Sequence, residues 1–103
     1  MSNDLYLGAS FNIASYAILN HILCQLTGLT PGKLSCNLVD AHVYVDHLEV
    51  IDRVIDNPVL PSPTLVLPKF NTLEELLELT AKDFSLADYQ CFKGDASAKL
   101  SVG

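Results

Sequence analysis

The longest hydrophobic pattern of the chain begins at Phe11 and continues to Leu29. Its apolar positions fall on every face of a helix with about 3.6 residues per turn, so they do not form a single stripe. We therefore expect a helix from about Phe11 to Thr27, with Ser10 as N-cap and Gly28 as left-handed C-cap. Because a helix that is apolar on all sides requires protein around it, this helix is predicted to be the buried centre of the fold.

Shorter alternating patterns predict strands in the remainder of the chain. Apolar and polar residues alternate between Lys33 and Val45, which predicts one bent strand or two strands around Asp40. Further short strands are predicted within Thr64–Leu67 and Asp83–Tyr89. Two helices are predicted at residues 46–56 and 72–79. Each of them begins with a capping-box pair, Asp46 with Glu49 and Thr72 with Glu75.

Together these elements predict an α+β fold in which the central buried helix packs on a small mixed sheet of three or four strands. At 103 residues we expect a single domain over residues 1–103. Half of the residues are apolar and the mean hydropathy is +0.30, which is high for so short a chain. Either the core is large for the length of the chain, or part of the apolar surface is covered by a partner.

The charge and the cysteines narrow the function further. The net charge is −6 and Arg53 is the single arginine, so a nucleic-acid interface is not expected. The three cysteines, Cys24, Cys36 and Cys91, form no Cys-x-x-Cys pair, which argues against a disulfide framework and against a zinc site. No signal peptide or transmembrane run is visible, and we expect a cytoplasmic protein that binds no metal and no membrane.

Two blocks of sequence carry a resemblance to a known family. The first is Ser-Asn-Asp-x-x-Leu-Gly-x-x-Phe-Asn-Ile-Ala-Ser-Tyr-Ala, which begins at Ser2. The second is Asp-Ala-His-Val-Tyr-x-x-His, which begins at Asp40. In order and spacing both blocks resemble the C-terminal portion of the thymidylate synthases. The resemblance implies a partial thymidylate-synthase-like fold and an enzyme that methylates dUMP to dTMP with 5,10-methylenetetrahydrofolate as cosubstrate.

The resemblance also implies roles for individual residues. In the nucleotide site, Asn12 would contact the pyrimidine, His42 and Tyr44 the deoxyribose, and Ser2 the phosphate. An amide offers a donor and an acceptor together, so Asn12 suits a uracil edge. His42 and Tyr44 are two residues apart on a predicted strand and therefore project to the same face.

Folate would be held by a second group of residues. The resemblance assigns Asp4 to the pterin ring and places Gly8 beside it, while the terminal Val102 and Gly103 would close over the folate. Asp4 can accept hydrogen bonds from the pterin, and a glycine at position 8 lets a flat ring approach the backbone.

The nucleophilic cysteine of the family lies in a Pro-Cys-His motif, which these 103 residues do not contain. We therefore expect no catalytic nucleophile in this chain, and an isolated chain that is inactive without an N-terminal half or a second subunit. The family is homodimeric, which makes a second subunit a natural partner. Two alternatives stay open: part of a pyrimidine nucleotide hydroxymethylase, and a non-catalytic fragment that binds a partner.

Overall fold

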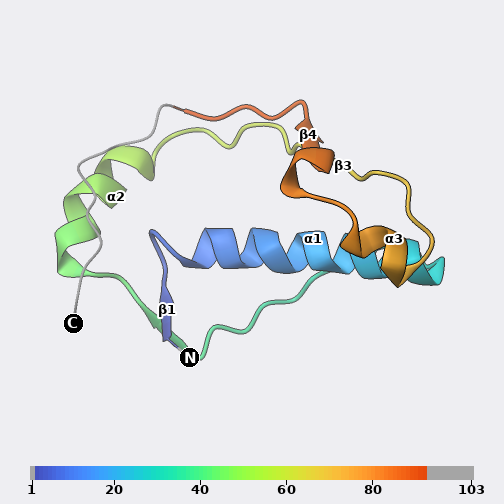
Figure 1. The fold of residues 1–103 in the computed structure, drawn as a ribbon. Coiled ribbons are helices and arrows are strands. Elements are labelled where there is room, and N and C mark those ends of the chain that lie inside the picture. Colours follow the sequence, from blue (N-terminus) through green and yellow to red (C-terminus); the bar gives the residue numbers. More distant parts are fainter. Residues whose placement is uncertain (1, 93–103) are drawn as a thin grey trace. The chain divides into compact units, whose positions relative to one another are not determined.

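The structure is a computed structural model that describes residues 2–92. Its strands are β1 (Ser2–Asp4), β2 (Asp40–His42), β3 (Thr64–Val66) and β4 (Ser85–Ala87) (Figure 1). Its α-helices are α1 (Ala9–Thr27), α2 (Leu48–Val54) and α3 (Leu73–Leu77). Two short 3-10 helices, η1 (Val45–His47) and η2 (Ala81–Asp83), precede α2 and β4. Helices and small sheets thus occur together, as the sequence predicts.

The chain divides into two compact units. Among the described residues, the first unit contains residues 2–14, Cys36–Val59 and residues 91–92. The second contains Ser15–Ser35 and Leu60–Gln90. The single domain over residues 1–103 that we expect from the sequence stays a prediction.

The boundaries of α1 follow from residues at its two ends. The helix begins at Ala9, and the amide of Asn12 donates to the carbonyl oxygen of Gly8 at 3.1 Å. Ser10 is therefore inside the helix, and its prediction as N-cap is wrong. The C-cap prediction is confirmed, because Gly28 has a φ of 75° and the amide of Leu29 donates to the carbonyl oxygen of Cys24 at 2.9 Å.

The predicted burial of this helix is wrong for the part of the chain that the structure describes. Ala9 is the one buried residue of α1, whereas Phe11 is 73% exposed and Tyr16 is 59% exposed. The other buried apolar residues in the described range are Val50 and Phe70. The helix stays exposed because the other described elements are too short and too few to cover a helix that is apolar on every face.

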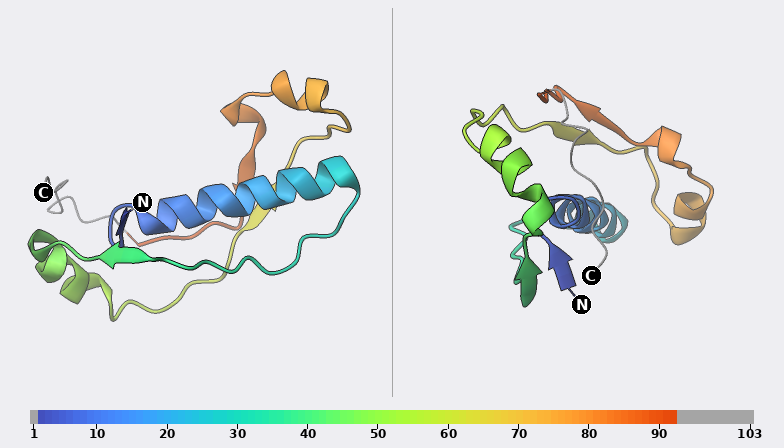
Figure 2. Two further views of the ribbon diagram at one scale, coloured as in Figure 1. Left: turned by 90° about the horizontal axis from the view of Figure 1, so that it is seen from below. Right: turned by 90° about the vertical axis from the view of Figure 1, so that its left-hand side faces the viewer.

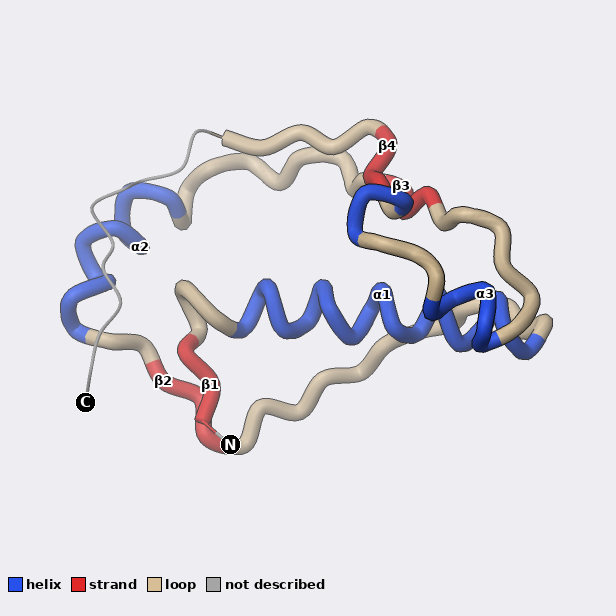
Figure 3. The backbone as a smooth tube through the Cα atoms, viewed as in Figure 1, coloured by secondary structure: helices blue, strands red, loops and turns tan. Residues whose placement is uncertain are grey.

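The strands form two separate sheets, where the sequence predicts one small mixed sheet. β1 pairs with β2 in parallel, with Ser2 opposite Asp40 and Asp4 opposite His42 (Figure 2). β3 pairs with β4 antiparallel, which confirms both of these predicted strands (Figure 3). Residues 33–39 are exposed and form no ladder among the described residues, so the strand expected there is wrong up to residue 39. Apolar and polar residues alternate in this segment as they do in a strand, but no described strand pairs with it.

One of the two predicted capping boxes is half formed. The Thr72 hydroxyl accepts from the amide of Glu75 at 3.2 Å, whereas the Glu75 carboxylate accepts from the amide of Asn71 at 3.4 Å and not from that of Thr72. The pair predicted at Asp46 and Glu49 is wrong, because Asp46 lies in η1 and α2 begins two residues after it.

Among residues 2–92, no helix combines the length and the apolar character needed to cross a membrane.

Candidate nucleotide and folate site

The parallel pairing of β1 with β2 brings together the two sequence blocks that the resemblance singles out. Asp4 is the register partner of His42, and the amide of Leu5 donates to the carbonyl oxygen of His42 at 2.9 Å. Parallel strands require a crossover between them, and here the crossover contains α1. As a result, residues far apart in sequence meet within the first unit.

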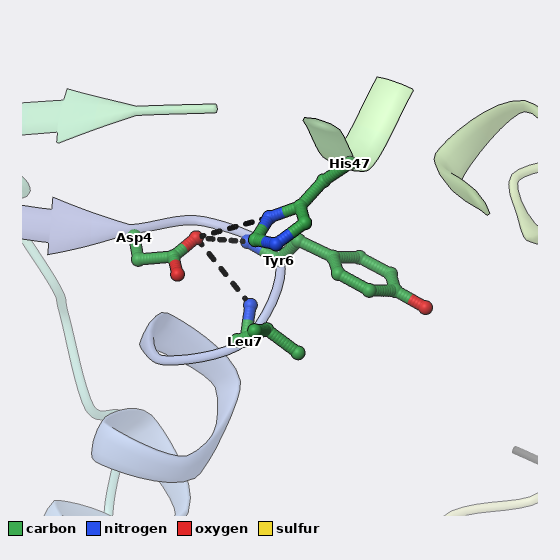
Figure 4. A network of polar contacts seen from close by, with 4 residues as sticks. All are labelled: Asp4, Tyr6, Leu7 and His47. Atoms are coloured by element: carbon green, nitrogen blue, oxygen red, sulfur yellow. Dashed lines mark hydrogen bonds and ion pairs between the residues drawn. The ribbon is translucent and has the colours of Figure 1, made fainter. Parts of the chain in front are cut away.

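Asp4 organises the turn between β1 and α1 (Figure 4). Its Oδ1 accepts from the amides of Tyr6 at 3.2 Å and Leu7 at 3.5 Å, which is the arrangement of an Asx-turn. The same oxygen lies 3.9 Å from Nδ1 of His47. The other carboxylate oxygen, Oδ2, accepts no hydrogen bond from the described residues, and the side chain is 17% exposed. One oxygen of Asp4 is thus held by the protein while the other can accept from a ligand.

Four rings lie side by side next to Asp4, and we call them the ring cluster: Tyr6, His42, Tyr44 and His47. The rings of His42 and Tyr44 are 4.8 Å apart and meet edge to face. His47 lies 5.7 Å from Tyr44 and 5.5 Å from Tyr6. His42 and Tyr44 lie next to one another, as predicted, but β2 ends at His42, so the prediction that Tyr44 lies on the same strand is wrong.

The imidazole of His42 has an unused polar atom. Its Nε2 is buried, and within residues 2–92 it has no hydrogen-bond partner. A buried polar atom without a partner is costly, so a ligand hydroxyl that reached Nε2 would be favoured there. Together with the neighbouring Tyr44 hydroxyl, this is an arrangement that can bind a sugar.

Gly8 packs against Asp4. A Cβ added at Gly8 would lie 3.3 Å from the carbonyl oxygen of Asp4 and 3.6 Å from its Cβ. The amide of Gly8 also donates to that carbonyl oxygen at 3.1 Å. A glycine at this position therefore keeps the turn tight and leaves its outer side free of any side chain.

The remaining predicted site residues are not part of the ring cluster. Asn12 lies in α1, where its side chain is exposed and makes no hydrogen bond with the described residues. Ser2 is placed by its backbone, opposite Asp40 in the β1–β2 ladder. Val102 and Gly103 lie outside the described residues.

The sequence interpretation missed Tyr6 and His47 as members of the site. Tyr44 and His47 are three residues apart, and the amide of His47 donates to the carbonyl oxygen of Tyr44 at 2.9 Å as η1 forms. In a 3-10 turn, residues three apart lie on the same side. The available signal was this spacing within the second block, but the pattern predicted an α-helical capping box there instead.

We also searched the described residues for a metal site, reactive thiols and a pocket. Within the described residues, no group of three or more His, Cys, Asp or Glu side chains could hold a metal ion. Cys24, Cys36 and Cys91 are free thiols. A shallow pocket of about 270 Å³ in the second unit is lined by His21, Cys24, Gln25, Leu29, Pro31 and Leu67. It contains none of the residues predicted to bind nucleotide or folate.

A family model described as thymidylate synthase matches residues 1–102. The chain belongs to the thymidylate synthase family. It is 47% identical over 90 residues to a probable thymidylate synthase of Escherichia phage T5, covering 85% of this chain and 32% of the phage protein. It is 39% identical over 88 residues to the thymidylate synthase of human herpesvirus 8 type P (isolate GK18), covering 85% of this chain and 26% of the viral protein.

The solved structure of thermostable thymidylate synthase A from Bacillus subtilis is also similar. It matches with a TM-score of 0.78 and 30% identity, covering 98% of this chain and 34% of the Bacillus chain. The similarity confirms the predicted α+β class and the resemblance to thymidylate synthases. The chain spans about a third or less of the length of each of these relatives.

Proposed function

We propose that this chain forms part of the nucleotide and folate site of a thymidylate synthase. The reaction would transfer a one-carbon unit from 5,10-methylenetetrahydrofolate to C5 of dUMP, with the folate also acting as reductant. The observation that carries the proposal is the β1–β2 pairing, which joins Asp4 of the first block to His42 and Tyr44 of the second.

The nucleotide would be held by residues of both blocks. His42 Nε2 and the Tyr44 hydroxyl would bind the deoxyribose hydroxyl, which would give the buried nitrogen its hydrogen-bond partner. The exposed amide of Asn12 would read the uracil edge, and Ser2 would contact the phosphate. Arginine is the usual side chain for binding phosphate, and Arg53 is the only one in the chain, so most phosphate contacts would come from residues outside these 103.

The folate would lie against the turn between β1 and α1. Oδ2 of Asp4 would accept from the amino and ring N–H groups of the pterin, while Oδ1 stays bound to the protein. The open side of Gly8 would let the flat ring approach, and Val102 and Gly103 would close over it. Folate serves here as a cosubstrate, and the proposal includes no metal.

The nucleophile would also come from outside these 103 residues. None of the three free cysteines lies in a Pro-Cys-His motif. The proposal therefore includes a further polypeptide segment, in the same chain or in a second subunit, that supplies the cysteine. We place the assembled enzyme in the cytoplasm, in keeping with the free thiols of this chain.

The test is release of tritium from dUMP labelled at C5, because methylation at C5 displaces that hydrogen. The chain would be assembled with the segment that carries the Pro-Cys-His motif, and methylenetetrahydrofolate would be added. We expect tritium release and dTMP as the product. A hydroxymethylated product would instead identify the hydroxymethylase alternative. If the folded assembly bound neither dUMP nor folate, the remaining alternative would be that this chain is a non-catalytic fragment that binds a partner.

A matched pair of variants tests the sugar contact. Tyr44→Phe keeps the ring against His42 and His47 but removes the hydroxyl, so we expect the KM for dUMP to rise about tenfold. Tyr16→Phe removes a hydroxyl from the exposed face of α1 and should leave the KM unchanged. An unchanged KM in Tyr44→Phe would contradict the assignment of Tyr44 to the deoxyribose.

A further inference from the structure

His47 is the most buried member of the ring cluster, yet the proposed function gives it no role. We propose that His47 is a positioning residue that fixes the orientation of the Asp4 carboxylate for folate. This inference rests on the proposed function, because it takes Asp4 as a folate contact. It adds a residue that would not itself touch either ligand.

The first argument is the geometry around Oδ1 of Asp4. Two backbone amides and Nδ1 of His47 all approach this one oxygen (Figure 4). The 3.9 Å between Nδ1 and Oδ1 is too long for a direct hydrogen bond and suits a contact bridged by water, because an imidazole carries a charge only when it is protonated. The two amides come from a local turn, whereas His47 is the contact from a distant part of the sequence. It therefore ties the carboxylate to the β2 side of the site.

The second argument is that His47 is itself held in place. Its side chain is 0% exposed, and its ring contacts Tyr6 on one block and Tyr44 on the other. A side chain so enclosed cannot bind a ligand in solution, and it cannot easily change rotamer. It is suited to holding a neighbouring group, and the Asp4 carboxylate lies 3.9 Å from its Nδ1.

The consequence for binding is specific to folate. Without Nδ1 the Asp4 carboxylate would keep its two amide contacts but would be free to rotate about them. Folate would then have to order the carboxylate when it binds, at a cost in affinity. The deoxyribose contacts of His42 and Tyr44 would stay in place, provided that the substituted side chain keeps the ring contacts.

The experiment uses His47→Phe in the assembled enzyme, because phenylalanine keeps a ring next to Tyr6 and Tyr44 but has no Nδ1. We expect the KM for folate to rise about tenfold, with kcat and the KM for dUMP changed less than about twofold. His21→Phe, the same change in the pocket of the second unit, is the matched control and should change neither constant. The dissociation constant for folate is measured alongside these rates.

A double-mutant cycle separates positioning from a general effect on structure. In an Asp4→Asn background, His47→Phe should weaken folate binding by less than about twofold, since the group that it positions has already been changed. A full tenfold effect in that background would overturn the proposal, because His47 would then act independently of Asp4. An unchanged folate constant in the single variant would overturn it as well.

A second comparison applies if His47→Phe does not fold. Asparagine places an amide near the position of Nδ1, whereas glutamine places it farther from the backbone, and both lose the ring. We expect His47→Asn to bind folate several-fold more tightly than His47→Gln, and equal affinities would overturn the proposal. Failure of the proposed function itself would look different, because the unsubstituted enzyme would then bind no folate and release no tritium.

Discussion

At the scale of single residues, Asp4 combines a structural role with the binding role that we propose. Its Oδ1 holds the turn that leads into α1, while its Oδ2, which accepts no hydrogen bond from the described residues, would accept from the pterin. His42 shows the same division, because its backbone oxygen accepts from Leu5 while its ring nitrogen Nε2 has no described partner. In both residues one oxygen is used by a backbone hydrogen bond that builds the site. A different side-chain atom is left without a described partner.

Asn12 provides the test of base selection at this scale. An ionised carboxylate only accepts hydrogen bonds, so Asn12→Asp would repel O4 of uracil and accept from the amino group of cytosine. We expect the ratio of kcat/KM for dUMP to that for deoxycytidylate to fall by about tenfold or more. Asn57→Asp, an exposed position in the same unit, adds the same charge and should leave the ratio unchanged. A constant ratio in Asn12→Asp would show that this side chain does not read the base.

At the scale of elements, the sequence predicts local structure well where local contacts decide it. Gly28 and the N-cap Thr72 are confirmed, because each depends on residues close by. The strands β3 and β4 are also confirmed, although residues 67–84, with α3 and η2, separate them. Residues 33–39 alternate like a strand but have no described partner, and alternation alone cannot supply one. The β1–β2 pairing could not be predicted from periodicity for the same reason, since its partners lie on either side of α1.

The C-cap of α1 gives a prediction for stability. Gly28 has a positive φ of 75°, so alanine there would be strained even though a Cβ would meet no atom within 4 Å. We expect Gly28→Ala to lower the free energy of unfolding by about 1 kcal/mol, measured by urea denaturation. Gly32→Ala is the control, because Gly32 has equally open surroundings without a positive φ, and it should be neutral or slightly stabilising. Equal effects of the two substitutions would contradict the capping role.

At the scale of the whole molecule, the apolar surface exceeds what the described chain covers. The sequence predicts correctly that α1 is apolar all round, but it cannot say which polypeptide covers the helix. The site shows the same limit, because the resemblance identified Asp4, His42 and Tyr44, whereas the approach of His47 to Asp4 depends on a long-range pairing. The apolar pattern and the motifs identify candidate residues of the core and of the site. Only the three-dimensional arrangement shows which of these residues are in contact.

The exposed face of α1 gives a prediction about association. Tyr16, Leu19 and Leu23 are 59%, 45% and 51% exposed and lie on one side of the helix. Surface of this kind favours association, so we expect the isolated chain to self-associate with rising concentration in sedimentation equilibrium. Serine at both Leu19 and Leu23 should weaken the association about tenfold or more. Val59→Ser, at a 99% exposed position outside the helix, should not change it.

The crossover between β1 and β2 also sets the order in which the site can form during synthesis. Asp4 is made before its strand partner and His47, which follow only after α1 and a long irregular segment have been added. Contacts of such high sequence separation carry a large loop-closure cost and are made late in folding. A ribosome-bound chain that ends before residue 40 would therefore carry Asp4, the proposed pterin contact, without β2 and His47 around it. The site as a whole forms only when the crossover closes.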